Sequence, residues 1–494
     1  MSGGLPEGFL VDIVADIDDD TPRLVYADWL EERGQEERAE FIRLQIERTR
    51  LPSWDAAQVR LRLRERELLD RHGESWLSEL PTIEGARWEG FRRGIVAEVS
   101  FTDFESMRAN AHACRAIAPV EAVTVRWPRR RESRRAVPPI AELRELSLTG
   151  RAETEDEIAF LADSPQLSTL RILTARGLWA EGLESLVASP HLARLKALRL
   201  PSNGLGNAGI QALIGAASLS ALEEIDLSGR GVSERYNNDP IVRLPGMESL
   251  AGWSGLATVR SLILSNNDLG RAGLRTLLRS PHSCSLKELS VRGGRLEASG
   301  MAEFASAPSG LLLDTLDIGE NLIGPDGVEH IATAACLREL KTLRIDRCEI
   351  SLLSAKVFVQ KASFLGGLRS LDVSHNHFGP IGLNALLKQN PPLLHTLIMR
   401  DNDLRYNGAE ILASSAASDV LLEVDLSHNG LGEASVRVLG ETSHLRNLLA
   451  LRLWDNPLLN KSSTATMKAS PLARRLMTLE MDDPNIPSGD DIPF

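Results

Sequence analysis

Two histidines and one aspartate stand at equivalent places in the C-terminal third of the chain. His375, Asp401 and His428 each come directly before an asparagine, at intervals of 26 and 27 residues. Imidazole and carboxylate are ligand types for a divalent metal, but each ligand atom must lie about 2.1 Å from the ion. Backbones two strands apart in a sheet are separated by about 10 Å. The set is therefore a weak candidate for a metal-dependent hydrolase, and the alternative is a mixed-charge rim that faces solvent or a partner.

A second candidate is the segment Trp127–Arg135, which holds five arginines and one glutamate. A nucleic acid or an acidic protein would bind such a cluster, and an exposed loop of an arginine-rich chain has the same composition. Arg129, Arg130 and Arg131 are its candidate contact residues. With 56 basic against 68 acidic residues, the net charge is −12. This balance, and the lack of interleaved aromatic residues, disfavour nucleic-acid binding.

The common catalytic motifs are absent from the sequence. It contains no glycine-rich loop before Lys-Ser/Thr, no His-Glu-x-x-His and no Gly-x-Ser-x-Gly. Its four cysteines form no Cys-x-x-Cys pair, which argues against a zinc module and against a disulfide framework. We therefore expect no cofactor and no enzymatic activity.

The distribution of apolar residues excludes two further classes. No apolar run reaches the ~18 residues of a membrane helix, and the first residues lack the basic and apolar regions of a signal peptide. Together with the cysteine usage, this favours the reducing cytoplasm of a bacterium, whose GC-rich coding explains the excess of arginine over lysine.

The elements that would position these side chains come from an internal repeat. Leu195-Lys-Ala-Leu-Arg-Leu-Pro-Ser-Asn203 recurs as Val259-Arg-Ser-Leu-Ile-Leu-Ser-Asn-Asn267. Fourteen copies begin between Val120 and Leu476, one of them at Leu167, with a period in the range of ~20–29 residues. In each copy the alternating residues predict a strand that points leucines inward. Asparagine then satisfies backbone groups at a bend, and Cys348, which takes its place in one copy, is predicted to be a buried thiol.

A second signature follows the asparagine. Asn203-Gly-Leu-Gly-Asn-Ala-Gly-Ile-Gln-Ala-Leu213 has its equivalent in residues 376–386, where glycine bends the chain and apolar residues recur at helical spacing. One strand and one helix per repeat must form a curved stack, with strands inside and helices outside.

Residues 91–486 thus resemble the ribonuclease-inhibitor type of leucine-rich repeat. The resemblance implies an α/β solenoid, a horseshoe of about 15 strands, the first one atypical, with a parallel concave sheet and convex helices. Members of this class mostly bind other proteins. Repeats of this type also occur in GTPase-activating proteins, which gives an alternative by fold analogy alone.

Residues 1–51 do not follow the repeat and predict a small domain of three helices. Residues 18–34 and 40–45 resemble the bacterial repeat-companion domain that precedes repeat arrays. Residues 52–90 are expected to be a helical connector, and residues 487–494 a frayed tail. One interval, from Leu222 to Val259, is ten residues longer than the period. Its insertion carries Tyr236, which is either a secondary partner contact or part of a tolerated surface loop.

The outward residues of the strands form the main candidate site. The strand-centre column begins at Arg171 and alternates charge of both signs with isoleucine, and the next outward column carries Trp454. Arg and Trp are enriched in residues that dominate protein–protein binding, and mixed charge favours partner choice. A solvated sheet face is the alternative. The predicted partner-binding residues are Arg344, Asp346, Asp372, Ile398, Arg400, Asp425, Arg452, Trp454 and Asp455.

These observations predict a non-catalytic module, monomeric when alone, that binds a protein of unknown identity on its concave face. An adaptor, a sensor or an inhibitor would work in this way. A rigid, preorganised sheet limits the ordering cost of association.

Overall fold

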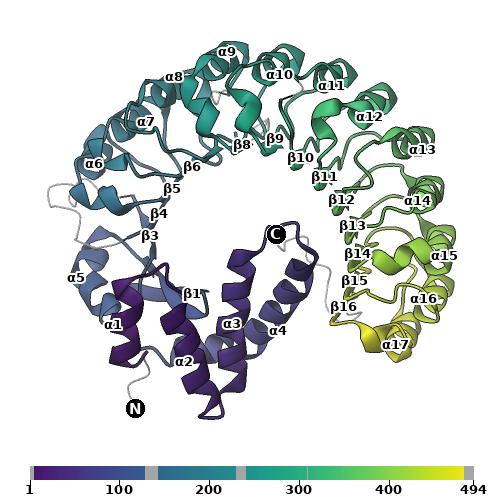
Figure 1. The fold of residues 1–494 in the computed structure, drawn as a ribbon, viewed down its shortest axis with the longest axis horizontal. Helices are drawn as coiled ribbons and strands as arrows, with labels where there is room; N and C mark the ends of the chain where they lie inside the picture. The colour runs from purple at the N-terminus through teal and green to yellow at the C-terminus, as the bar shows by residue number, and fades with distance from the viewer. Residues whose placement is uncertain (1–4, 128–142, 230–240, 309, 483–494) are drawn as a thin grey trace. The chain divides into compact units, whose positions relative to one another are not determined.

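The computed structural model describes residues 5–127, 143–229, 241–308 and 310–482 (Figure 1). The chain forms two compact units. The first comprises Met1–Ser53 and Leu61–Leu264, and the second Trp54–Arg60 and Ser265–Phe494.

Some of the predicted contacts lie outside the described residues. They are the arginines Arg129, Arg130 and Arg131, the insertion residue Tyr236, and the tail 487–494.

Within each unit the described strands follow one another in chain order. β1 pairs antiparallel with β2, and the successive pairings from β2 to β8 and from β9 to β16 are parallel. The strands are β1 (Ala86–Arg92), β2 (Ile95–Phe101), β3 (Ala122–Arg126), β4 (Glu145–Thr149), β5 (Ile172–Ala175), β6 (Ala197–Arg199), β7 (Glu224–Asp226), β8 (Ser261–Ile263), β9 (Glu288–Ser290), β10 (Thr315–Asp317), β11 (Thr342–Arg344), β12 (Ser370–Asp372), β13 (Thr396–Ile398), β14 (Glu423–Asp425), β15 (Ala450–Arg452) and β16 (Thr478–Glu480).

The helices from α5 onward alternate with the strands and cover one side of the strand layer in each unit (Figure 1). The helices are α1 (Glu7–Ala15), α2 (Thr21–Glu31), α3 (Glu36–Arg50), α4 (Ala56–Ser78), α5 (Phe104–Arg115), α6 (Glu155–Ala162), α7 (Ala180–Val187), α8 (Gly206–Gly215), α9 (Leu244–Gly252), α10 (Gly270–Leu278), α11 (Ala298–Ala305), α12 (Gly324–Thr333), α13 (Leu352–Lys361), α14 (Gly379–Lys388), α15 (Arg405–Ser414), α16 (Glu433–Gly440) and α17 (Lys461–Ala469).

The predicted strand–helix repeat is confirmed, and its core is the leucine column. The inward residues of neighbouring strands, such as Leu343, Leu371 and Leu397, are paired in register and completely buried. Burying one such side chain contributes about 1.5–3 kcal/mol. The column therefore holds each strand against its own helix and against the next repeat.

The asparagines join neighbouring repeats through buried hydrogen bonds. Oδ1 of Asn376 accepts hydrogen bonds from the backbone N–H groups of Cys348 (3.0 Å) and Ile350 (3.1 Å) in the preceding repeat. Its Nδ2 donates to the carbonyl of Ile345 at 2.9 Å. Buried polar groups without a partner would be costly, so this residue type is needed at the bend. Cys348 is fully buried, which confirms the predicted thiol, and burial raises its pKa to about 12.

Several helices of the repeats begin with a residue in the left-handed backbone region. Gly206, Gly270, Gly324 and Gly379 occupy this place with φ between 53° and 60°. Glycine is favoured there because it has no Cβ. Arg405 adopts the same conformation at the start of α15, with φ of 48°.

The repeat predicted to begin at Leu167 was placed three residues too early. Leu167 lies in a short 3-10 helix, Pro165–Thr169, and Leu170 is the first residue of the repeat. The residue paired with Arg199 at the strand centre is therefore Thr174, and Arg171 lies outside the column. Leu167 and Leu170 have the spacing of the true pair and are both buried, so spacing alone does not distinguish the two registers.

The expectation of a purely helical connector at 52–90 was wrong in part. α4 is followed by β1, which forms a hairpin with β2 through Arg93 and Gly94, both at positive φ (49° and 80°). Two central residues at positive φ match a type I′ hairpin turn. The described residues therefore contain one strand more than the expected fifteen.

The N-terminal region holds the three predicted helices, α1 to α3, within residues 1–51. α2 and α3 share one hydrophobic cluster, and α3 shares a second with α4 and the hairpin. Phe41 of α3 packs against Trp76 of α4, with ring centroids 5.1 Å apart, and against Phe91 of β1 at 5.2 Å. α3 thus packs against the hairpin and against the part of α4 that belongs to the first unit.

The fold class is confirmed as an α/β leucine-rich-repeat solenoid preceded by helices. Among the described residues, none of the helices has the length and apolar character needed to cross a membrane.

Candidate functional site

The outward side chains of the second unit form a surface that we call the open face. It is the side of strands β9 to β15 opposite their helices, and the observed register aligns its members from strand to strand. Its members are Arg292, Asp317, Arg344, Asp346, Asp372, Ile398, Arg400, Asp425, Arg452 and Trp454.

One end of the open face is organised around Arg292. Its Nη1 and Nη2 atoms donate to the two carboxylate oxygens of Asp346, both at 2.6 Å, and Nη2 also lies 2.9 Å from Glu320. A bidentate pair of this kind is short and orientationally fixed. Its hydrogen bonds to Asp346 raise the pKa of Arg292, although burial acts in the opposite direction.

This pair reaches across an intervening repeat because Gly319 has no side chain. A Cβ at Gly319 would lie 2.3 Å from Nη1 of Arg292 and 2.5 Å from Oδ1 of Asp346. The glycine therefore provides the space in which the guanidinium and the carboxylate meet.

Arg400 is held by a buried partner. Its Nε donates to Oδ2 of Asp425 at 2.6 Å, and Asp425 is only 1% exposed. The other carboxylate oxygen, Oδ1, accepts a hydrogen bond from the backbone N–H of Ser427 at 3.0 Å. Asp425 thus positions Arg400 and is itself inaccessible to a partner.

Arg452 and Trp454 share a carboxylate. The Nε of Arg452 and the indole Nε1 of Trp454 donate to the same oxygen of Glu480, at 3.1 and 2.9 Å. Nη1 of Arg452 also donates to Glu423 at 2.6 Å. Burial alone would lower the pKa of Arg452, but the two carboxylates raise it. The indole ring, half-buried, is thereby fixed beside the guanidinium.

Between the Arg292–Asp346 pair and the Arg400–Asp425 pair the side chains of the open face are less constrained. Half of the Arg344 side chain is exposed, and its Nη1 lies 3.9 Å from the carboxylate of Asp317. Asp372 accepts hydrogen bonds from Ser374 at 2.6 and 2.9 Å, and burial raises its pKa. Ile398, next to Asp372 in the register, is half-buried.

The histidine rim does not assemble into a metal site. Nδ1 of His375 lies 3.2 Å from Asp401, whereas Nε2 of His428 lies 3.0 Å from Asp455. Each histidine therefore pairs with the carboxylate of the following repeat. The described residues contain no group of three or more His, Cys, Asp or Glu side chains that could hold a metal. The four residues of the rim all have a backbone with positive φ, so they share a conformation as well as charged or titratable side chains. They are His375, Asp401, His428 and Asp455.

The predicted site residues thus fall into two groups. Asp346 and Asp425 are buried and hold arginines in place, while Arg344, Asp372, Ile398, Arg400, Arg452, Trp454 and Asp455 are at least partly accessible. The sequence did not point to Gly319, which leaves space for the Arg292–Asp346 pair, or to Glu423, which binds Arg452. The signal for Gly319 was its place in the outward column between two charged residues.

Comparisons with known proteins agree with this architecture. Residues 255–278 and 368–387 match the family model described as Leucine Rich repeat. The ribonuclease inhibitor of Sus scrofa is 32% identical over 199 residues, which cover 38% of this chain and 43% of that protein. The ribonuclease inhibitor of Mus musculus is 26% identical over 316 residues, covering 62% and 66%.

A third relative is the human NACHT, LRR and PYD domains-containing protein 5, 28% identical over 294 residues that cover 55% of this chain and 23% of that protein. The chain therefore spans less than two thirds of the length of each of these relatives. Among solved structures, an internalin from Listeria monocytogenes superimposes with a TM-score of 0.41 at 17% identity, covering 78% of this chain and 90% of that one.

Proposed function

We propose that this leucine-rich-repeat protein of the ribonuclease-inhibitor type is a non-catalytic module that binds a protein partner on its open face. The observation that carries the proposal is the internal pairing of Arg292, Arg400 and Arg452. Because neighbouring carboxylates already fix these side chains, little conformational entropy is lost when a partner docks.

The accessible members of the face have the chemistry of a contact surface. Arg344 offers an exposed guanidinium, and Ile398 and Trp454 place apolar area between charges. Aromatic and arginine side chains of this kind dominate binding energy at interfaces, while the surrounding charges select the partner. Two relatives are inhibitors by name. Among an adaptor, a sensor and an inhibitor, this favours the inhibitor.

The other assignments have less support. The role of a GTPase-activating protein rests on fold analogy alone. The four cysteines are free thiols, three of them buried, which favours a reducing compartment such as the cytoplasm. We also propose that the N-terminal helices form a bacterial repeat-companion domain.

The test compares an open-face variant with a matched helix-face variant. Arg344→Glu with Ile398→Lys changes the open face, and Arg437→Glu with Ile381→Lys makes the same changes on the exposed helices of the same unit. A partner captured from the source cells by the wild-type chain is purified and its Kd measured. We expect at least 100-fold weaker binding for the open-face variant and a change below twofold for the helix-face variant. Equal affinities would place the docking site elsewhere.

Arg400 needs a different design because its removal leaves Asp425 buried without its cation. Arg400→Ala is therefore combined with Asp425→Asn. Trp454→Phe keeps an aromatic ring at this position but removes the indole N–H. Thermal unfolding identifies variants that bind weakly only because they are unfolded.

A further inference from the structure

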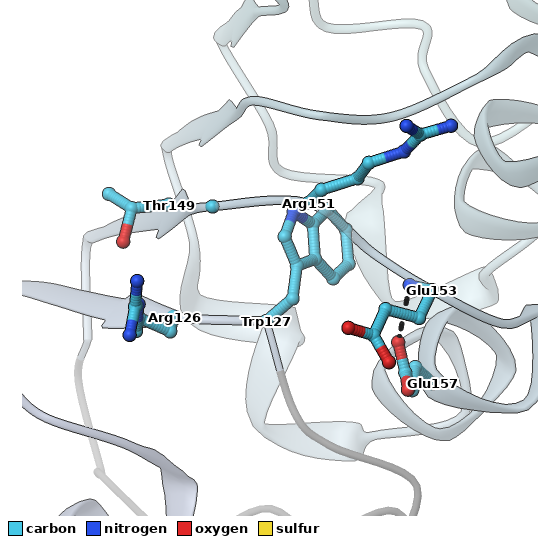
Figure 2. Close-up of a pocket in the computed structure, with 7 residues that line it drawn as sticks. Arg126, Trp127, Thr149, Arg151, Glu153 and Glu157 are labelled. Carbon is cyan, nitrogen blue, oxygen red and sulfur yellow. Dashed lines mark hydrogen bonds between the residues drawn. The ribbon is translucent and has the colours of Figure 1, made fainter.

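A cavity in the first unit lies beyond the ends of β3 and β4, where α6 begins (Figure 2). Its volume is about 210 Å³. A water molecule needs only about 10–15 Å³ of such space. The cavity is therefore large enough for a small organic molecule.

One wall of the cavity contains a carboxylate with an unused oxygen. Glu157 is 1% exposed, and its Oε2 accepts hydrogen bonds from the backbone N–H groups of Glu153 (2.7 Å) and Thr154 (3.3 Å). Its Oε1 is buried and has no hydrogen-bond partner. A buried carboxylate with an unsatisfied oxygen is costly, and a cation held beside it would offset its charge.

The rest of the lining gives the cavity two chemically different ends. Glu153 adds a second carboxylate near Glu157, and the ring of Trp127 lies between these acids and Arg151 (Figure 2). The indole N–H of Trp127 donates to the carbonyl of Arg176 at 2.6 Å, which fixes the ring. Aromatic rings and carboxylates together attract ammonium and guanidinium groups. The exposed side chain of Arg151 favours an anion on the side of the ring away from these acids (Figure 2).

We propose that this cavity binds a small zwitterion of the amino-acid class. The cationic group lies beside the Trp127 ring at the carboxylates of Glu153 and Glu157, and the carboxylate of the ligand lies toward Arg151. The proposal is independent of the open face, which belongs to the other unit.

The experiment uses the full chain and isothermal titration with two probes that differ in one group. L-arginine carries a cation and a carboxylate, whereas agmatine lacks the carboxylate. We expect saturable binding of L-arginine and at least tenfold weaker binding of agmatine. Glu157→Gln keeps an acceptor for the backbone but turns the cavity-facing acid into an amide, and we expect it to weaken L-arginine binding at least tenfold.

Glu155→Gln is the matched control, because it removes the same charge from an exposed position in the first turn of α6. It should leave the affinity within twofold. Thermal unfolding of both variants shows whether the fold is retained. The proposal is overturned if L-arginine at 10 mM does not bind the folded protein, if Glu157→Gln binds it as tightly as wild type, or if Ca²⁺ or Mg²⁺ alone occupies the site in competition with it.

Discussion

At the residue scale, Gly319 determines whether Arg292 and Asp346 can meet. A Cβ at this position would lie only 2.3 and 2.5 Å from their side-chain atoms, so Gly319→Ala must displace the guanidinium or the carboxylate. Asp346 is 5% exposed and would lose its bidentate cation while staying buried. We expect the free energy of unfolding to fall by about 1–3 kcal/mol, as for a buried hydrogen-bonding group left without its partner. Denaturant unfolding at equilibrium measures this change.

Gly366→Ala is the control for that substitution. A Cβ at Gly366 would have no heavy atom within 4 Å, and its backbone does not require glycine. It should change the free energy of unfolding by less than about 0.5 kcal/mol. If the two variants are equally stable, the arginine–aspartate pair does not stabilise the second unit.

At the element scale, the left-handed residues that start α14 and α15 make opposite predictions for two equivalent positions. Gly379→Ala places a Cβ at φ of 60° and 2.2 Å from Cδ2 of Leu352, so the free energy of unfolding should fall by about 1–2 kcal/mol. Arg405→Gly removes a side chain from the same conformation at φ of 48°. It should raise the free energy of unfolding by about 0.5–1 kcal/mol. Chemical denaturation of each variant measures both changes.

The ion pair of Arg405 does not alter the expected sign. Its Nε lies 2.6 Å from Asp403, but both side chains are more than 60% exposed, and such pairs contribute little. If Arg405→Gly destabilises the protein, the left-handed turn is not the source of strain at this position.

The same scale shows how much of the fold was accessible from the sequence. The leucine spacing predicted the strands of the repeats, their order and the helix after each one, because the same spacing of apolar residues recurs in every repeat. It misplaced the repeat at Leu167, where Pro165 starts a 3-10 turn and a second leucine copies the correct spacing. The strand β1 was missed because it pairs with β2 in a hairpin outside the repeat, with charged residues in its alternation.

The candidate site was predictable only as columns of residues. Strand periodicity places Arg400 and Asp425 on one face, and the register confirms the columns from β9 onward. It does not say which side chain is buried and which is exposed, since that depends on contacts between repeats 25 or more residues apart. The role of Glu157 could not be predicted from the sequence either, because the missing hydrogen-bond partner of its Oε1 depends on the position of the surrounding backbone.

At the scale of the whole molecule, the N-terminal helices of the first unit are tied to its repeats by charge. Asp18, which lies just before α2, accepts hydrogen bonds from Arg144 at 2.6 and 2.9 Å. Deeper in the same contact, Arg23 is fully buried and lies 3.3 Å from Glu121, which directly precedes β3. Burial lowers the pKa of Arg23 and raises that of Glu121, so each charge depends on the other.

Removing one member of the buried pair should therefore loosen the helices from the repeats. Glu121→Ala leaves a buried guanidinium without its carboxylate, which costs about 3–5 kcal/mol. Asp18→Asn breaks only an exposed pair and should cost less than about 1 kcal/mol. Hydrogen exchange followed by mass spectrometry should show faster exchange in α2 for Glu121→Ala and little change for Asp18→Asn. If Arg23→Met with Glu121→Leu restores slow exchange, the effect of Glu121→Ala comes from the stranded charge. If α2 exchanges at the wild-type rate in Glu121→Ala, packing alone holds the helices, and the buried pair has no part in joining them to the repeats.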